Sequence, residues 1–338
     1  MTRSDLHAAT DVAPGRVAPR PFAQIEDDRL RGLDFVLTDI DDTLTTDGRL
    51  PAIAYAALET LQRAGLKVVP ITGRPAGWCD LIARIWPVDA VVGENGAFYF
   101  ACEPGGGMTR VFHKTDAERR ADRARLDALA GTILASVPRA RLSADQPFRE
   151  ADLASDCAED GDRLTETEID AIVACFEAAG AVAKVSSIHV NGWYGQYDKL
   201  VMTRRLLAER YGVDMDTAGD RIAFVGDSPN DAPMFAFFDT SIAVANFADF
   251  AHRPRKRNDR AITHLLVVRD WLDDLDQREA VQDRDEDALE ASLHTLTREW
   301  GWTHKPWVDH QGSFTAKELI TARNSAHEVL LACVQACN

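Results

Sequence analysis

Three carboxylates come directly after a short apolar run near the start of the chain. The run, residues 35–37, has the composition of a strand buried on both faces of a parallel sheet, and Asp39, Asp41 and Asp42 follow it. Unpaired charges at the edge of a core are costly unless a cation or hydrogen-bond donors satisfy them. Since side chains two residues apart share one face of a strand, Asp39 and Asp41 would project together as oxygen ligands for a divalent cation. A simple Asp-rich turn is the structural alternative.

A second polar segment follows the next apolar strand along the chain. Residues 67–71 predict this strand, and Thr72, Gly73 and Arg74 come after it. A threonine hydroxyl with a glycine amide behind it can donate hydrogen bonds to an anionic oxygen. Thr72 would alternatively serve as the N-cap of the helix that starts near Pro75.

Two more polar features stand late in the chain. Lys199 opens a predicted helix over residues 199–211, and the acidic loop 226–231 follows a predicted strand over 221–225. Taken alone, Lys199 would be a solvated surface charge, and Asp231 could simply favour the dipole at a helix start. Their place shortly after or before strands of one sheet favours a shared site.

The elements that must position these residues alternate along the chain. Strand, helix and strand patterns succeed one another over residues 35–93 and again over 199–267, which predicts a parallel sheet with right-handed crossovers. We therefore predict an α/β protein with a doubly wound, Rossmann-like core. Ligands of such sheets gather at the carboxyl ends of the strands, where the polar segments fall.

Between these two halves lies a block of different character. Residues 97–102 and 108–113 predict a β-hairpin, residues 115–137 a charged helix, and Thr165 with Glu168 a capping box before a second helix. We predict that this block is an α+β cap inserted into the sheet. The predicted organisation is a disordered tail over 1–28, a core over 29–96 and 193–270, a cap over 97–192, and a helical extension over 271–338.

The bulk properties narrow the possible partners. The 338 residues exceed the usual size of one domain, and the formal net charge of −16 argues against nucleic-acid and anionic-membrane partners. The six cysteines form no CxxC pair, and no apolar run approaches about 18 residues, the length of a membrane-spanning helix. No signal peptide is evident at the N-terminus, so we expect a cytoplasmic protein.

Taken together, the four polar segments resemble, in their order, the motifs of the haloacid dehalogenase superfamily of aspartyl phosphotransferases. The resemblance covers roughly residues 33–250. The insertion between the second and third motifs is similar to the α/β cap of the Cof-type and sugar-phosphatase branch, as is the transition at Glu94, Asn95 and Gly96.

The chemistry of these residue types suggests a role for each. Asp39 would attack phosphorus, and Asp41 would protonate the leaving alcohol and then deprotonate water. Lys199 would neutralise charge on the nucleophile and the phosphate. Asp227 would bind Mg²⁺ with Asp39 and, by the resemblance, with the main-chain carbonyl of Asp41.

The full set of expected site residues follows from these roles and from the cap strand near residue 190, whose polar face suits a sugar or is simply exposed. Expected as catalytic are Asp39, Asp41, Thr72 and Lys199; as substrate-binding Thr43, Gly73, Arg74, Asn95, His189 and Asn191; and as metal-binding Asp39, Asp41, Asp227, Asn230 and Asp231.

The expected function is a Mg²⁺-dependent phosphomonoesterase that hydrolyses a phosphorylated sugar or a similar small metabolite through an aspartyl-phosphate. A phosphomutase similar to the phosphomannomutases is the alternative, distinguished by protecting the aspartyl-phosphate from water. A non-catalytic interaction protein is disfavoured because the motif set is intact. Dehalogenase chemistry is disfavoured because halide loss has no need of the proton that Asp41 would supply.

Overall fold

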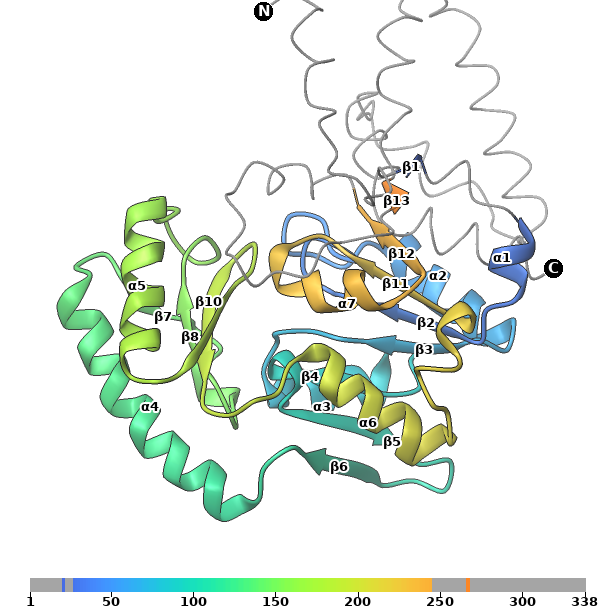
Figure 1. The fold of residues 1–338 in the computed structure, drawn as a ribbon, viewed down its shortest axis with the longest axis horizontal. Coiled ribbons are helices and arrows are strands. Elements are labelled where there is room, and N and C mark those ends of the chain that lie inside the picture. The colour runs from blue at the N-terminus through green and yellow to red at the C-terminus, as the bar shows by residue number, and fades with distance from the viewer. Residues whose placement is uncertain (1–19, 22–26, 245–265, 268–338) are drawn as a thin grey trace, which may run out of the picture. The chain divides into compact units, whose positions relative to one another are not determined.

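Six parallel strands form the central sheet of this computed structural model, which describes residues 20–21, 27–244 and 266–267 (Figure 1). The strand order is β1-β13-β12-β11-β2-β3, and every neighbouring pair is parallel. The strands are β1 (Arg20–Pro21), β2 (Phe35–Thr38), β3 (Lys67–Pro70), β11 (Ile222–Gly226), β12 (Thr240–Ala243) and β13 (Leu266–Val267).

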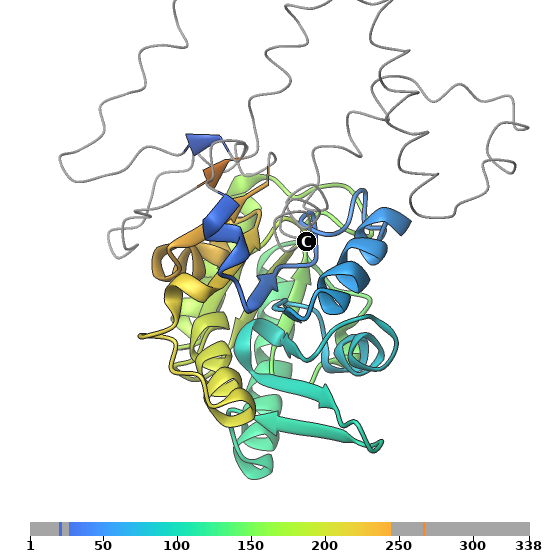
Figure 2. The same cartoon turned by 90° about the vertical axis from the view of Figure 1, so that its right-hand side faces the viewer.

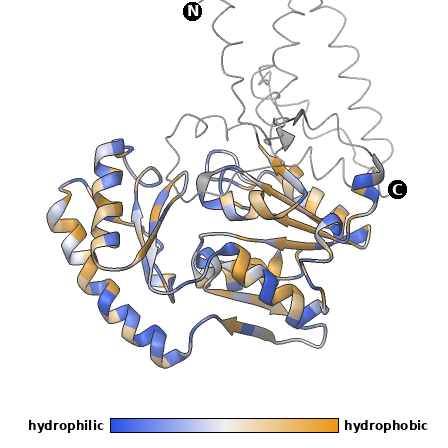
Figure 3. Ribbon diagram, viewed as in Figure 1, coloured by the Kyte–Doolittle hydropathy of each residue, from blue (hydrophilic) through white to orange (hydrophobic). Residues whose placement is uncertain are grey.

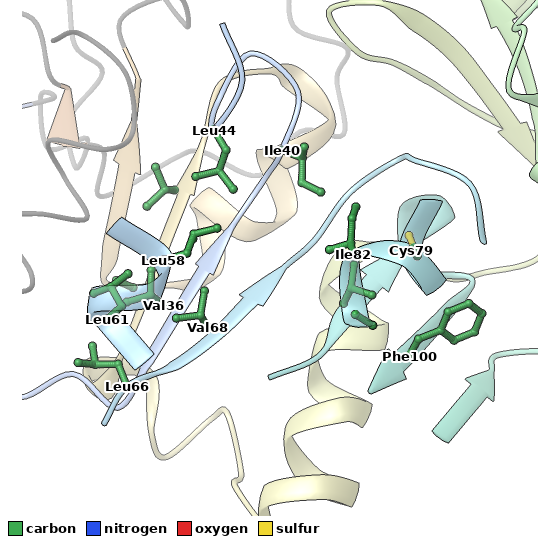
Figure 4. Close-up of a cluster of buried hydrophobic side chains, with 14 of the residues drawn as sticks. Val36, Ile40, Leu44, Leu58, Leu61, Leu66, Val68, Cys79, Ile82 and Phe100 are labelled. Atoms are coloured by element: carbon green, nitrogen blue, oxygen red, sulfur yellow. The ribbon is translucent and has the colours of Figure 1, made fainter. Parts of the chain in front are cut away.

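Helices cover both faces of this sheet, because its central strands bury alternate residues on opposite sides. Val36 packs in one apolar cluster with α2 (Ala52–Arg63) and α3 (Ala76–Ile85), which Figure 4 shows in part. Phe35 and Leu37 pack in another cluster with α6 and α7. Figure 2 shows the two helix pairs on opposite sides of the strands. The bounds of the latter pair are α6 (Lys199–Tyr211) and α7 (Ala232–Phe237).

Prolines and a glycine mark the limits of the early helices. Pro51 and Pro75 keep extended backbone angles and are the N-cap residues, so α2 and α3 begin one residue later. After α2 the chain turns at Gly65 with a φ of 91°, which favours glycine because it has no Cβ.

The predicted hairpin differs from the expectation in its partner. β5 (Phe98–Cys102) and β6 (Met108–Phe112) form a three-stranded antiparallel sheet with β4 (Val91–Gly93), and Val92 bridges to Ile71 beside β3. The hairpin therefore pairs with the core and not with the cap sheet. The physical reason is burial, since Phe98 and Phe100 pack in the same cluster as α3.

The inserted segment after the hairpin builds its own sheet and core. Its antiparallel order is β7-β8-β10-β9, and α4 and α5 pack on this sheet around a separate apolar cluster. Figure 3 shows the many hydrophilic residues along α4. Both helices start with a threonine capping box, as predicted for α5. The bounds are α4 (Asp116–Ser136), β7 (Arg141–Leu142), β8 (Leu153–Asp156), α5 (Glu166–Ala178), β9 (Val182–Val185) and β10 (His189–Trp193).

The two connections between this cap and the core lie against each other. The ring of His113, just before the cap, is 4.9 Å from the ring of Tyr197, just after it. A side chain at Gly195 would meet Lys114, which lies beside it. The chain thus leaves the core and returns to it at one place.

The sequence predicted a disordered tail over residues 1–28 and a helical extension over 271–338. The predicted tail contains ordered elements, because β1 pairs with β13 and a short helix, α1 (Asp27–Arg31), follows. The predicted extension over 271–338 lies outside the described residues. Within the part of the chain that the structure describes, no helix is long and apolar enough to cross a membrane.

Candidate active site

The carboxyl ends of the neighbouring strands β2 and β11 bring three carboxylates together. The amide of Asp39 donates to the carbonyl of Val225, 2.9 Å away, which fixes the end of β2 beside β11. Carboxylate oxygens of Asp39, Asp227 and Asp231 all lie within 4.8 Å of one another, and all three residues are buried. The carboxylates predicted from two distant sequence motifs therefore form one cluster.

A buried lysine bridges two members of this cluster. Lys199 Nζ is 2.7 Å from Oδ1 of Asp39 and 2.7 Å from Oδ1 of Asp231. It stands at the start of α6, whose N-cap is Asp198. The second oxygen of Asp231 accepts the amides of Asp227 and Ser228. Lys199 is thus a buried ion-pair partner and not the surface charge of the alternative interpretation.

Burial and mutual repulsion dominate the electrostatics of the cluster. The pKa of Asp39 is raised to about 8, chiefly by burial; the charge of Lys199 opposes this rise, and the charges of Asp231 and Asp41 contribute to it. Burial, followed by the charges of Asp39 and Asp231, raises the pKa of Asp227 well above its usual value. One amine does not balance three buried carboxylates, and this hard-oxygen donor set fits a divalent cation such as Mg²⁺.

The remaining residues expected around the metal have other contacts. Thr43 Oγ1 donates to Oδ1 of Asp227 over 3.4 Å. Asn230 Oδ1 accepts the hydroxyl of Ser228, and Asn230 borders a cavity between core and cap. The Asp41 side chain turns to Arg74 rather than to the carboxylate cluster.

Thr72 and Gly73 follow β3, the neighbour of β2. Thr72 Oγ1 accepts the amide of Arg74 at 3.0 Å, so the hydroxyl also serves the turn before α3. Asn95 has a left-handed φ of 54°, donates its amide to the Thr72 carbonyl, and has a buried side-chain Nδ2 with no hydrogen-bond partner. A Cβ on Gly73 would lie 3.2 Å from that Nδ2, so a side chain there would crowd Asn95.

Arg74 joins the core to the cap. Its Nε donates to both oxygens of Asp41 at 2.9 Å, and its Nη2 lies 2.6 Å from Asp41 Oδ1 and 2.7 Å from Oε1 of Glu159, a cap residue. The opposite carboxylate oxygen of Glu159 is 2.8 Å from Nε2 of His189 on β10. The Arg74 side chain is only 4% exposed, so this is a buried network.

A second arginine docks the cap loop before β8. Arg149 Nη1 donates to the Gly73 carbonyl at 2.9 Å, and its guanidinium also binds Asp145 and Asp152. Asp152 in turn accepts Asn191 Nδ2 at 2.9 Å. The predicted substrate residue Asn191 is therefore held by the cap as well as bordering the cavity.

The carboxylate of Glu94 docks the same loop from the core side. It accepts the amide of Ala76 at the start of α3 and the amides of Glu150, Ala151 and Asp152. Sequence reasoning missed this role and those of Arg149 and Glu159. Glu94 lies in the transition segment 94–96 that the sequence identified. The loops around residues 149 and 159 have no periodicity that would distinguish one charged residue from another.

The cavity between the sheet and the cap is small, about 10 Å³. This is room for about one water molecule. The cap therefore lies closed on the carboxyl ends of the strands. The lining residues are Asp39, Asp41, Gly73, Arg74, Ser186, Ser187, Ile188, His189, Asn191, Ser228 and Asn230.

Comparison with known proteins supports the fold. No family model matches the chain, and no curated protein matches it. Among solved structures, a protein of Thermoplasma acidophilum is 20% identical with a TM-score of 0.51, and the match covers 69% of this chain and 91% of that one. A sucrose-phosphatase from Synechocystis, solved with sucrose and phosphate, is 15% identical with a TM-score of 0.48, covering 71% of this chain and 92% of that one.

A haloacid dehalogenase-like hydrolase from Bacteroides thetaiotaomicron is also similar, at 15% identity and a TM-score of 0.47, covering 70% of this chain and 94% of that one. At these identities the likeness is one of fold. The fold predicted from the sequence, a doubly wound parallel sheet with an inserted α+β cap, is confirmed.

Proposed function

We propose that this protein is a Mg²⁺-dependent phosphatase of the haloacid dehalogenase type, acting on a small phosphorylated sugar or similar metabolite in the cytoplasm. The observation that carries the proposal is the buried cluster of Asp39, Asp227 and Asp231 bridged by Lys199 at the strand ends. Structural stability does not account for such a cluster, because burying several like charges is costly. A cation and a phosphate group account for it.

The proposed reaction has two steps. An oxygen of Asp39 attacks phosphorus, the bond from phosphorus to the ester oxygen breaks, and that oxygen takes a proton from Asp41 to leave as an alcohol. In the second step Asp41 takes a proton from water, whose oxygen attacks the aspartyl-phosphate. Asp39 and inorganic phosphate are released, and Asp41 is protonated again.

The other residues orient and neutralise. Lys199 holds Asp39 in position and offsets charge on the phosphate. Asp39, Asp227 and Asp231 would hold Mg²⁺, which when bound neutralises phosphoryl oxygens. Thr72 and the amide of Gly73 would donate to the same oxygens. We further propose that the segment between residues 113 and 197 is a cap, and that this cap excludes water from the reaction.

The test is hydrolysis of p-nitrophenyl phosphate, with release of inorganic phosphate measured with Mg²⁺ and with excess EDTA. We expect turnover only with Mg²⁺, and a mass increase of one phosphoryl group on the peptide that contains Asp39 after rapid quenching. Asp39→Asn should abolish both signals while circular dichroism stays unchanged. Full activity in EDTA, or wild-type turnover by Asp39→Asn, would contradict the mechanism.

The mutase alternative is tested in a second experiment. Glucose 1-phosphate with a trace of glucose 1,6-bisphosphate should release inorganic phosphate. Its conversion to glucose 6-phosphate without phosphate release would replace the proposed phosphatase by a mutase.

A further inference from the structure

The cap side of the cavity carries almost no positive charge. Of the described cap residues that line it, Ser186, Ser187, Ile188 and Asn191 are uncharged, and His189 contacts a carboxylate. Lysine is absent from the described lining residues, and their one arginine is Arg74 of the core. An anionic group on the substrate would have to be recognised by that guanidinium.

Arg74 is already surrounded by carboxylates. It binds Asp41 and Glu159 at 2.6 to 2.9 Å, and its Nη1 lies 3.5 Å from Oδ2 of Asp145. These acidic neighbours raise the pKa of Arg74 above its usual value, against its burial. Three carboxylates around one guanidinium leave an excess of negative charge on this side of the cavity.

A second buried arginine nearby does not reverse this excess of negative charge. Arg149 is matched by Asp145 and Asp152, at 2.8 and 3.0 Å. Two guanidinium groups, Arg74 and Arg149, thus face the four carboxylates of Asp41, Asp145, Asp152 and Glu159. We call these six side chains the acidic wall.

We infer that the site takes phosphate esters whose leaving alcohol carries no negative charge of its own. It rejects those with a second phosphate or a carboxylate on the alcohol. This inference rests on the proposed phosphatase and adds which esters that phosphatase would hydrolyse. The reason is electrostatic: a further anion brought against an acidic, buried wall is repelled with little screening by salt.

Four esters on one six-carbon frame test the inference. Glucose 6-phosphate has a neutral alcohol, glucosamine 6-phosphate a cationic one, 6-phosphogluconate an added carboxylate, and glucose 1,6-bisphosphate an added phosphate. We expect kcat/KM to fall at least about tenfold for each added negative charge, from a charge 8–10 Å away at an effective dielectric of roughly 20. Glucosamine 6-phosphate should equal or exceed glucose 6-phosphate.

A pair of variants assigns the selectivity to the wall. Glu159→Gln removes one negative charge and releases one contact of Arg74, so the preference for glucose 6-phosphate over 6-phosphogluconate should shrink several-fold. Glu177→Gln makes the same change on the exposed side of α5 and should leave the ratio unchanged. The ratio is informative even if the variant is slower, because a general loss of rate cancels. An unchanged ratio in Glu159→Gln would overturn the role of the wall.

Binding measured by calorimetry separates this inference from the proposed function. Affinities that follow the charge order without any turnover would keep the charge selectivity and overturn the phosphatase. Turnover of all four esters at similar kcat/KM would keep the phosphatase and overturn the inference. No binding of any of the four would overturn the inference as well.

Discussion

Arg74 holds the Asp41 carboxylate on both oxygens, so the proposed acid has one fixed orientation. A general acid works only when its proton lies within hydrogen-bond reach of the leaving oxygen. A guanidinium fork fixes a carboxylate plane, whereas a lysine acts as a point charge. The arginine of the second motif therefore serves the geometry of the first.

Replacing this acid should hurt poor leaving groups most. Asp41→Asn should slow hydrolysis of an alkyl phosphate such as glucose 6-phosphate by ~10²–10⁴-fold, the usual contribution of general acid catalysis. p-Nitrophenyl phosphate needs little protonation of its leaving group and should lose much less. Steady-state kinetics on both substrates measures this, and equal losses would remove Asp41 from the acid role.

The sequence was informative where chemistry restricts the residue type. Asp39, Lys199 and Asp227 could be predicted to meet because each stands at the end of a strand or the start of a helix in a parallel sheet. Glu159 and Arg149 could not, because their partners are set by how the cap rests on the core. The hairpin was assigned to the wrong sheet for the same reason: alternation predicts β5 and β6 but does not name their neighbour.

At the scale of elements, Glu94 links α3 to the cap loop before β8. Each of its carboxylate oxygens accepts two main-chain amides, so the side chain satisfies four donors without water. A carboxylate at the N-terminus of α3 also favours the helix dipole. The loop that carries Arg149 and Asp152 is therefore fixed from below by a core residue.

An isosteric change at this link should destabilise the protein. Glu94→Gln turns one acceptor oxygen into a donor and leaves two buried amides unpaired, at about 1–3 kcal/mol each. We expect the free energy of unfolding in urea to fall by roughly 2–6 kcal/mol on that basis. The exposed change Glu177→Gln is the control, and a loss no larger than the control would show that Glu94 does not carry the docking.

The contact of Glu159 with Arg74 gives the link between cap and core a pH dependence. Burial alone would raise the pKa of Glu159, but its contacts with His189 and Arg74 outweigh this effect and lower the pKa to about 2. A depressed carboxyl pKa stabilises the folded state fully above the ordinary value near 4.5. This stabilisation is lost as the pH falls toward 2.

The urea midpoint of the wild type should therefore exceed that of Glu159→Gln most at pH 6, and the difference should narrow at pH 4 and again at pH 3. Linkage requires this sign because the unfolded state binds more protons at Glu159 in that interval. A difference that stays constant from pH 6 to pH 3 would show that the Glu159 charge adds nothing to stability.

At the scale of the whole described molecule, the proposed phosphoryl transfer and its selectivity would come from different parts of the chain. The core supplies Asp39 and Asp227 at strand ends and Lys199 at the start of α6, and the cap supplies Ser186, Ser187, Ile188, His189 and Asn191 of the cavity lining. With a cavity of about 10 Å³, a sugar phosphate fits only after the cap moves away. Release of product would then require the same motion and could limit the rate.

Because the two connections at His113 and Tyr197 adjoin, the cap is a modular insertion. A segment that leaves and returns at one point can be lengthened, shortened or swapped without pulling the sheet out of register, since the gap to be closed is short. We expect a chain in which a short glycine-serine linker replaces residues 115–192 to keep its parallel sheet, measured by circular dichroism and cooperative unfolding. Grafting the cap of another phosphatase in place of residues 115–192 would then transfer the substrate preference of that cap to an unchanged core domain.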